Sequence, residues 1–267
     1  MPSGKRARQQ RRATVPAPPA PRVRREASPR VLAIAGGVIV IIVVAVLLGF
    51  VLTGGKSSPS TSSLPLHGSL VNALPNAADV HAEFKGIRQS GLFLGSAAAP
   101  VTLVEYIDLQ CPFCQQLETQ VMPGIVAKYV RSGKLKIEAR VLGFIGPDSI
   151  RGRNAMFAAG LQNHAFDFAQ LLYDNQQTEN TGWLNDAMVD KAASSIPGVN
   201  PRQLVAASTT DAVAAIGRRI DGQGKGDRIV STPSLLIGKA GATPQPVQLR
   251  NATDAKSLNA AIEAALR

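Results

Sequence analysis

Two cysteines carry the chemistry that this sequence can be expected to perform. They are the only cysteines among 267 residues, and they stand in the motif Cys111-Pro112-Phe113-Cys114. Two thiols separated by two residues can form a disulfide and exchange it with other thiols, with a thiolate as the attacking group. A purely structural disulfide is a poor explanation, because such bonds in secreted domains join distant parts of the chain. A bridge across two residues closes almost no loop.

A zinc site is the second alternative, since C-x-x-C supplies half of the ligands of many such sites. Four ligands would require two of the three histidines, which are His67, His81 and His164. None of them is paired with another at the spacing of zinc ligands. We therefore expect no metal, and no cofactor other than a redox-active Cys111–Cys114 disulfide.

The motif stands between a predicted strand and a predicted helix. Residues 101–110 begin with the β-branched and apolar run V-T-L-V-E-Y-I, which predicts a buried strand. After Cys114, apolar residues recur with a helical period at positions 117, 121, 125 and 129. The start of a helix stabilises an anion through unpaired N–H groups and the helix dipole, and Pro112 suits its first turn. We therefore expect Cys111 to be the nucleophile and Cys114 the resolving cysteine.

The rest of the body predicts an α/β fold with a large helical insertion. Further strands are predicted at residues 93–94, 134–142, 229–237 and 247–249. Helical patterning covers about 149–223, including helices at 183–193 and 201–220, and the glycine-rich segment 221–226 closes it. A final amphipathic helix is predicted at 254–266. The strand at 134–142 would run parallel to the strand at 101–110, because a helical crossover joins them.

The first 80 residues have a different character from the body. Residues 1–30 hold nine Lys or Arg and one Glu, and they predict a disordered basic tail. Residues 31–53 carry no charge and are long enough to cross a membrane, longer than the apolar region of a secretory signal. We expect an uncleaved transmembrane signal anchor there, with cleavage as the alternative. A Gly/Ser/Pro linker at 54–80 then leads to a folded domain at 81–267.

The distribution of charge indicates the topology. Basic residues precede the apolar span and are nearly absent directly after it, which places the N-terminus in the cytoplasm and the body outside. The tail also accounts for most of the net charge of +11. The body has no basic stripe, so nucleic acid is not an expected partner.

Three segments of the body resemble DsbA-like thioredoxin-fold proteins, in particular the membrane-anchored BdbD-like group. They are D-L-Q-C-P-F-C at 108–114, A-F-D-F-A-Q-L-L-Y-D-N-Q at 165–176 and S-T-P-S-L-L-I-G at 231–238. The resemblance spans about residues 93–266. It implies a thioredoxin fold with a helical insertion and protein thiol–disulfide oxidoreductase activity.

The resemblance also implies roles for single residues near the cysteines. Cys111 matches the attacking cysteine and Cys114 the resolving one. Pro233 matches a cis-proline that lies beside the disulfide and helps to hold an extended substrate, with Thr232 before it. Glu105 matches a buried acid that moves protons for the resolving cysteine, whereas its alternative is a solvated charge at a strand edge.

The dipeptide between the cysteines, Pro112-Phe113, is expected to contact substrate. The best-known oxidases of the family carry a histidine in this dipeptide, so Phe113 removes one source of thiolate stabilisation and predicts a weaker oxidant. Asp108 is expected to be a turn or capping residue close to the site.

These observations together predict a membrane-anchored oxidase that donates the Cys111–Cys114 disulfide to extracytoplasmic protein thiols. A redox partner in the membrane would then reoxidise the pair. A reductase or an isomerase is the alternative within the same chemistry, although an isomerase would need room for a dimerisation domain. A non-catalytic thioredoxin-fold binding module is the alternative outside it, and the intact cysteine pair argues against that class.

Overall fold

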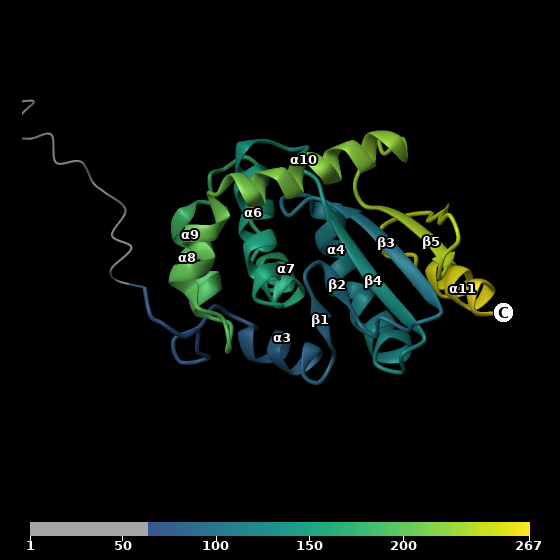
Figure 1. The fold of residues 1–267 in the computed structure, drawn as a ribbon, viewed down its shortest axis with the longest axis horizontal. Coiled ribbons are helices and arrows are strands. Elements are labelled where there is room, and N and C mark those ends of the chain that lie inside the picture. The colour runs from purple at the N-terminus through teal and green to yellow at the C-terminus, as the bar shows by residue number, and fades with distance from the viewer. Residues whose placement is uncertain (1–63) are drawn as a thin grey trace, which may run out of the picture. The chain divides into compact units, whose positions relative to one another are not determined.

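The computed structural model describes residues 64–267 (Figure 1). Its strands are β1 (Gln89–Ser90), β2 (Phe93–Leu94), β3 (Val101–Ile107), β4 (Leu135–Val141), β5 (Ser234–Lys239) and β6 (Gln245–Pro246). Its helices are α3 (Ala77–Phe84), α4 (Pro112–Gln120), α5 (Met122–Ile125), the π-helical turn η3 (Val126–Val130), α6 (Pro147–Leu161), α7 (Ala165–Asp174), α8 (Asp186–Ser194), α9 (Pro201–Ser208), α10 (Asp211–Gly226) and α11 (Ala255–Leu266). The α/β arrangement with a helical insertion between β4 and β5 is therefore confirmed.

A six-stranded sheet in the order β1-β2-β4-β3-β5-β6 organises these elements. Strands β3 and β4 are parallel, with Val101 opposite Leu135 and Ile107 opposite Val141. Every other pair of neighbouring strands is antiparallel. The parallel pair confirms the predicted crossover, which runs through α4, α5 and η3. Both edge strands, β1 and β6, are only two residues long.

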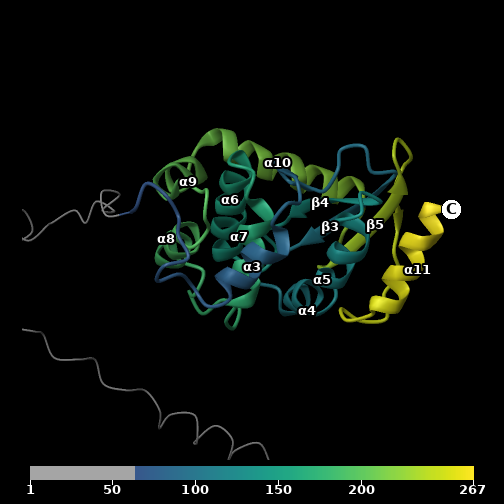
Figure 2. The same ribbon diagram turned by 90° about the horizontal axis from the view of Figure 1, so that it is seen from below.

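Helices cover both faces of the sheet. Figure 2 shows α10 on one side of β3 and β4, and α4, α5 and α11 on the other. The C-terminal end of α10 reaches the sheet, where the Tyr106 hydroxyl donates to the Asp227 carboxylate at 2.6 Å. On the opposite face, the Tyr129 hydroxyl donates to Glu263 of α11 at 2.8 Å. The two strands that carry the site are thus held between helices.

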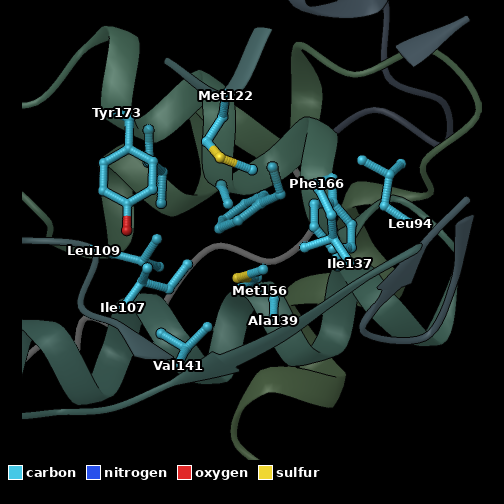
Figure 3. Packing of buried hydrophobic residues seen from close by; sticks show 14 of the residues in the cluster. Leu94, Ile107, Leu109, Met122, Ile137, Ala139, Val141, Met156, Phe166 and Tyr173 are labelled. Atoms are coloured by element: carbon cyan, nitrogen blue, oxygen red, sulfur yellow. The ribbon is translucent and has the colours of Figure 1, made fainter. Parts of the chain in front are cut away.

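The interior of the molecule lies between the sheet and the helical insertion. Alternate residues of β4 are fully buried, as the period of a strand on a buried face requires. Figure 3 shows Ile137, Ala139 and Val141 of this strand converging with Met156 of α6 and Phe166 of α7. Since the insertion shares one core with the sheet, it holds the site from the side as a rigid unit.

The helical insertion differs from its prediction at two places. The helix expected at 201–220 is two helices, because the Thr210 side chain accepts from the Val213 N–H and begins α10 as a new helix. The glycine-rich segment 221–226 was expected to close the block, but it forms the last turns of α10. A Cβ at Gly224 would lie at ordinary van der Waals distance from Leu142 and Tyr106, so this part of α10 packs against the sheet.

The two C-terminal strands are shifted from the predicted positions. Strand β5 begins at Ser234 rather than at residue 229, and segment 229–233 is a loop. Strand β6 occupies 245–246 rather than 247–249. The Val247 N–H nevertheless donates to the Leu235 carbonyl at 2.8 Å, so the predicted pairing with β5 exists at a different register.

Helix α3 lies partly in the stretch that the sequence assigns to the linker. Residues 77–80 are its first half, and Val80 is buried. Phe84 packs against Phe166 of α7, with ring centroids 6.4 Å apart. Further upstream, the Gly68 N–H donates to the Val199 carbonyl at 2.8 Å. The packed body therefore includes residues that the predicted boundary at 81 leaves out.

The tail predicted at 1–30 and the anchor predicted at 31–53 lie outside the described residues. Within 64–267, no helix combines the length and the apolar character that crossing a membrane requires.

Candidate active site

The two cysteines lie at the junction of β3 and α4, as the sequence predicts. Strand β3 ends at Ile107, and α4 begins at Pro112 with Cys111 as its N-cap residue in an extended conformation. Cys111 is 5% exposed and Cys114 is completely buried. Both are free thiols in this structure. The geometry therefore gives a substrate access to Cys111 alone.

The surroundings of Cys111 stabilise its thiolate. A hydrogen bond from the Cys114 thiol makes the largest contribution and lowers the pKa of Cys111 from 9.0 to about 6, with help from Thr232 and from the backbone N–H groups of Cys114 and Phe113. Burial acts in the opposite direction and is outweighed. The helix N-terminus thus supplies part of the stabilisation that the sequence predicts.

Cys114 has the opposite tendency. Burial raises its pKa well above 9.0, and the neighbouring Cys111 sulfur raises it further. Near neutral pH the pair therefore holds a thiolate at Cys111 and a protonated thiol at Cys114. This is the division of labour expected of a nucleophile and its resolving partner.

The loop before β5 lies against Cys111. Its Thr232–Pro233 peptide is cis, as the resemblance implies. In the dithiol, the Cys111 thiol donates to the Thr232 carbonyl oxygen at 3.4 Å. On the helix side, Pro112 and Phe113 are exposed, with Phe113 at 58%. The four residues predicted to bind substrate thus surround the accessible sulfur, and their roles remain predictions.

Glu105 is buried inside the protein and does not lie at a solvated strand edge. It is 1% exposed, and it stands on β3 opposite Ala139 and Leu235. Its Oε1 has no hydrogen-bond partner within residues 64–267. Burial, together with the nearby Glu118 carboxylate, raises its pKa well above 4.5. Its surroundings therefore favour the protonated form of Glu105, the form that can donate a proton.

Glu118 is a second buried acid, one that the sequence reasoning missed. It lies one helical turn after Cys114 on α4, so the two side chains share a face of the helix. Burial, together with the nearby Glu83 of α3, raises its pKa from 4.5 to about 8. The pKa of Glu83 is itself raised to about 7, mainly by burial. The sequence could have indicated Glu118 by its position four residues after Cys114, on the same face of the predicted helix.

Comparisons with known proteins identify the family. The family model described as Thioredoxin matches residues 88–264. The chain belongs to the thioredoxin family. The probable disulfide bond formation protein D of Bacillus cereus is 30% identical over 113 residues, which cover 41% of this chain and 52% of that relative. The protein of the same description from Bacillus anthracis is 24% identical over 164 residues, covering 60% of this chain and 76% of that one. The first match thus spans about half of the relative's length.

Solved structures agree with the fold. The oxidised form of BdbD from Bacillus subtilis superposes with a TM-score of 0.58 at 21% identity, covering 67% of this chain and 96% of that one. The alpha-DsbA1 protein of Wolbachia pipientis gives a TM-score of 0.56 at 16% identity, covering 68% and 92%. The resemblance to DsbA-like and BdbD-like proteins is therefore confirmed, including the helical insertion.

In this thioredoxin-family chain, Asp108 organises the loops around the site. It is completely buried, and its carboxylate accepts from the N–H groups of Gln110, Phe144 and Ile145 and from the Ser149 hydroxyl. The predicted turn role is thus confirmed. These four hydrogen bonds also fix the loop after β4 and the start of α6 against the segment that leads to the cysteines.

Two side chains of the helical insertion support the same segment. The Tyr173 hydroxyl donates to the Asp108 carbonyl at 3.2 Å, and the Gln176 amide donates to the Leu109 carbonyl at 2.9 Å. Both residues lie in the 165–176 segment that resembles the family, but nothing in their spacing indicated contacts with the cysteine loop. The insertion therefore holds the backbone just before Cys111.

Proposed function

We propose that this protein is a thiol–disulfide oxidoreductase that acts as an oxidase outside the cytoplasm. It donates the Cys111–Cys114 disulfide to the thiols of secreted or membrane proteins. The observation that carries the proposal is the asymmetry of the pair, in which the accessible sulfur is stabilised as a thiolate and the buried one as a thiol. The descriptions of the Bacillus relatives as disulfide bond formation proteins support it.

Oxidation of a substrate proceeds in two exchanges. A substrate thiolate attacks the Cys111 sulfur, the bond to Cys114 breaks, and Cys114 leaves with the electron pair. Because burial raises the pKa of Cys114, this sulfur takes up a proton, for which Glu105 is the buried donor. A second substrate thiolate then attacks the substrate sulfur of the mixed disulfide and releases Cys111 as a thiolate. The substrate loses two electrons and the cysteine pair gains them.

The low pKa of Cys111 favours this direction. A thiol of low pKa is a good leaving group, so release of the oxidised substrate is fast. A stabilised thiolate also makes the dithiol form more favourable, which is the property of an oxidant. Pro112 removes one N–H donor and Phe113 brings no charge. We therefore expect a reduction potential between about −120 and −220 mV, weaker than the strongest oxidases and more oxidising than thioredoxin at about −270 mV.

Equilibration of the full-length protein with glutathione buffers measures this potential, and thermal melting of both redox forms provides an independent measurement. For an oxidase, the dithiol form melts at the higher temperature. A potential near about −270 mV, with the disulfide form melting higher, would assign the protein to the reductases. If the protein shows no exchange with a reduced peptide, the remaining alternative is a non-catalytic binding module.

The proposed location rests on the sequence. Nine basic residues precede the uncharged stretch 31–53, so an anchored protein would place its body outside the membrane, beside a membrane partner that reoxidises the pair. Protease added to intact spheroplasts should then digest the C-terminal domain. Protection of that domain until the membrane is opened would contradict the proposed location.

A further inference from the structure

A pocket lies beside the active site, between the loop after β4, the start of α6 and the end of α10. Its volume is about 260 Å³, and its lining includes Phe144, Ile150, Arg153, Asp221, Lys225 and Ile229. Figure 1 shows how α10 crosses from α6 and α9 to the sheet, which places its last turns next to the ends of β3 and β4. The cysteine chemistry described above does not use this pocket.

Arg153 forms a charged part of the pocket wall. The residue is 8% exposed, and its Nη1 donates to the Asp221 carboxylate at 2.7 Å. Its Nε has no acceptor within residues 64–267. A side chain in place of Gly217 would lie 3.0 Å from Nη2, and one in place of Gly143 would lie 3.5 Å from Nη1. Gly217 therefore makes room for the guanidinium, whereas the 3.5 Å at Gly143 is an ordinary contact.

A buried guanidinium with unpaired N–H donors lowers the stability of the protein unless an acceptor binds to it. Leaving a buried charged donor unsatisfied costs more free energy than a neutral one, and a hydrogen bond to a charged group recovers part of that cost. Of the guanidinium donors, Nη1 already binds Asp221 and Nε is covered, so Nη2 is the donor that can reach an oxygen of an entering carboxylate. The exposed Lys225 on the same wall adds a second positive charge. The chemistry of the wall fits a carboxylate.

The position of the pocket connects it to the reaction. The Phe144 N–H on its rim donates to Asp108, three residues before Cys111. Ile229, on another side, stands three residues before Thr232, whose carbonyl accepts from the Cys111 thiol. The rim of the pocket is thus connected to the surroundings of Cys111 through Asp108 and through the loop that carries Thr232. Phe144 and Ile150 are 49% and 44% exposed, so they can cover the methylene groups of an entering side chain.

We propose that this pocket binds an acidic side chain of the reduced polypeptide substrate, close to the cysteine that is oxidised. Arg153 and Lys225 recognise the carboxylate, and Phe144 and Ile150 pack on its aliphatic part. The proposal rests on the proposed function, because it names a preference among the substrates of the same site. It makes Arg153 and Lys225 determinants of specificity for cysteines that have Asp or Glu nearby.

The test compares two reduced dicysteine peptides that differ only in a Glu or a Gln next to the reacting cysteine. Full-length protein in its disulfide form is mixed with each peptide at neutral pH, and the second-order rate constant of a single turnover is measured. The wild type should oxidise the Glu peptide about tenfold faster, the effect of one charge-assisted hydrogen bond. Peptides with serine in place of cysteine should compete in the same order, which measures binding without exchange.

Variants locate the preference. Arg153→Met should abolish it, and Lys225→Gln should reduce it about two- to fivefold, as loss of an exposed ion pair does. Lys256→Gln, an equally exposed lysine on α11, is the matched control and should keep the wild-type ratio. Because Arg153→Met leaves the Asp221 carboxylate without its partner, the melting temperature of this variant is measured first. If it does not fold, Lys225→Gln alone decides the outcome.

Equal rates for the two peptides on the wild type would overturn the inference, as would a full preference in every folded variant. Oxidation of neither peptide would instead refute the proposed function, and the serine peptides would still report on the pocket. The two failures are therefore distinguishable.

Discussion

Replacing Glu118 by glutamine should remove a large part of the protein's loss of stability between pH 5 and pH 8. The pKa of Glu118 is about 8 in the folded protein and 4.5 as a model value, mainly because burial disfavours its charge. Between these two values the folded protein binds more protons than the unfolded chain, so its free energy of unfolding falls as the pH rises. Glutamine has the shape of the protonated acid and does not titrate.

The magnitude follows from the shift. One pKa unit corresponds to about 1.4 kcal/mol, and most of the range from 4.5 to about 8 lies between pH 5 and pH 8. The wild type should therefore lose about 3–4 kcal/mol across that interval through Glu118, and the variant should not. For a domain of this size the difference corresponds to roughly 10 °C in melting temperature.

Cys111 complicates the wild-type curve. Its pKa is lowered to about 6, so its thiolate adds stability as the pH rises from there toward 9.0. This contribution is the same in the wild type and in Glu118→Gln. It therefore drops out of the difference between their free energies of unfolding.

The assay is thermal unfolding of the full-length dithiol protein at pH 5 and pH 8. Glu118→Gln and the wild type should melt at similar temperatures at pH 5 and separate at pH 8. Glu179→Gln, which changes an exposed glutamate, is the control and should follow the wild type. Parallel curves for Glu118→Gln and the wild type would mean that Glu118 is ionised in the folded state, and the reasoning about the buried acids would be wrong.

The other predictions concern the cysteines and the loops. Cys111→Ser should abolish exchange, whereas Cys114→Ser should accumulate mixed disulfides with substrate, as non-reducing electrophoresis would reveal; normal exchange by Cys111→Ser would contradict the assignment. Alkylation of Cys111 should have its midpoint at about pH 6 while Cys114 stays unreactive, so equal labelling at mildly acidic pH would count against the asymmetry. Asp108→Ala should lower the free energy of unfolding by about 3–5 kcal/mol in denaturant titrations, because it leaves several buried donors without an acceptor. A loss below about 1 kcal/mol would show that water replaces the carboxylate.

Local patterns predicted the elements that carry the chemistry. Strand β3 and helix α11 have strong periodicity, and each lies within a few residues of its expected range. The helical pattern after Cys114 continues to position 129, but the structure divides it into α4, α5 and the π-helical turn η3. Patterns failed where tertiary packing decides the structure. The glycine-rich end of α10 looks like a loop in isolation, yet it is helical as far as Gly226 and packs beside Tyr106 of the sheet. Helix α3 is short and follows Asn76, whose left-handed backbone is no strong signal of a helix start.

The candidate site shows the same contrast between residues that local motifs indicate and residues that only tertiary packing reveals. The C-x-x-C motif located the two cysteines directly, whereas Pro233 was located only through the resemblance of residues 231–238 to the family. Burial of Glu105 depended on a register between β3 and its neighbours that no single segment records. Glu118 appeared as one polar residue in a helix that also has exposed polar residues, and its inward direction becomes evident only when α4 is packed.

The two-residue edge strands have a consequence for the proposed reaction with reduced polypeptides. An exposed sheet edge offers unpaired N–H and C=O groups on which an extended chain can add as a further strand. Here β1 ends the sheet on one side, and β6 on the other side contains Pro246, which has no N–H to offer. A client chain therefore finds little backbone to align with at either end. For the proposed oxidase, short edges would therefore disfavour strand addition by a substrate chain and so favour its release.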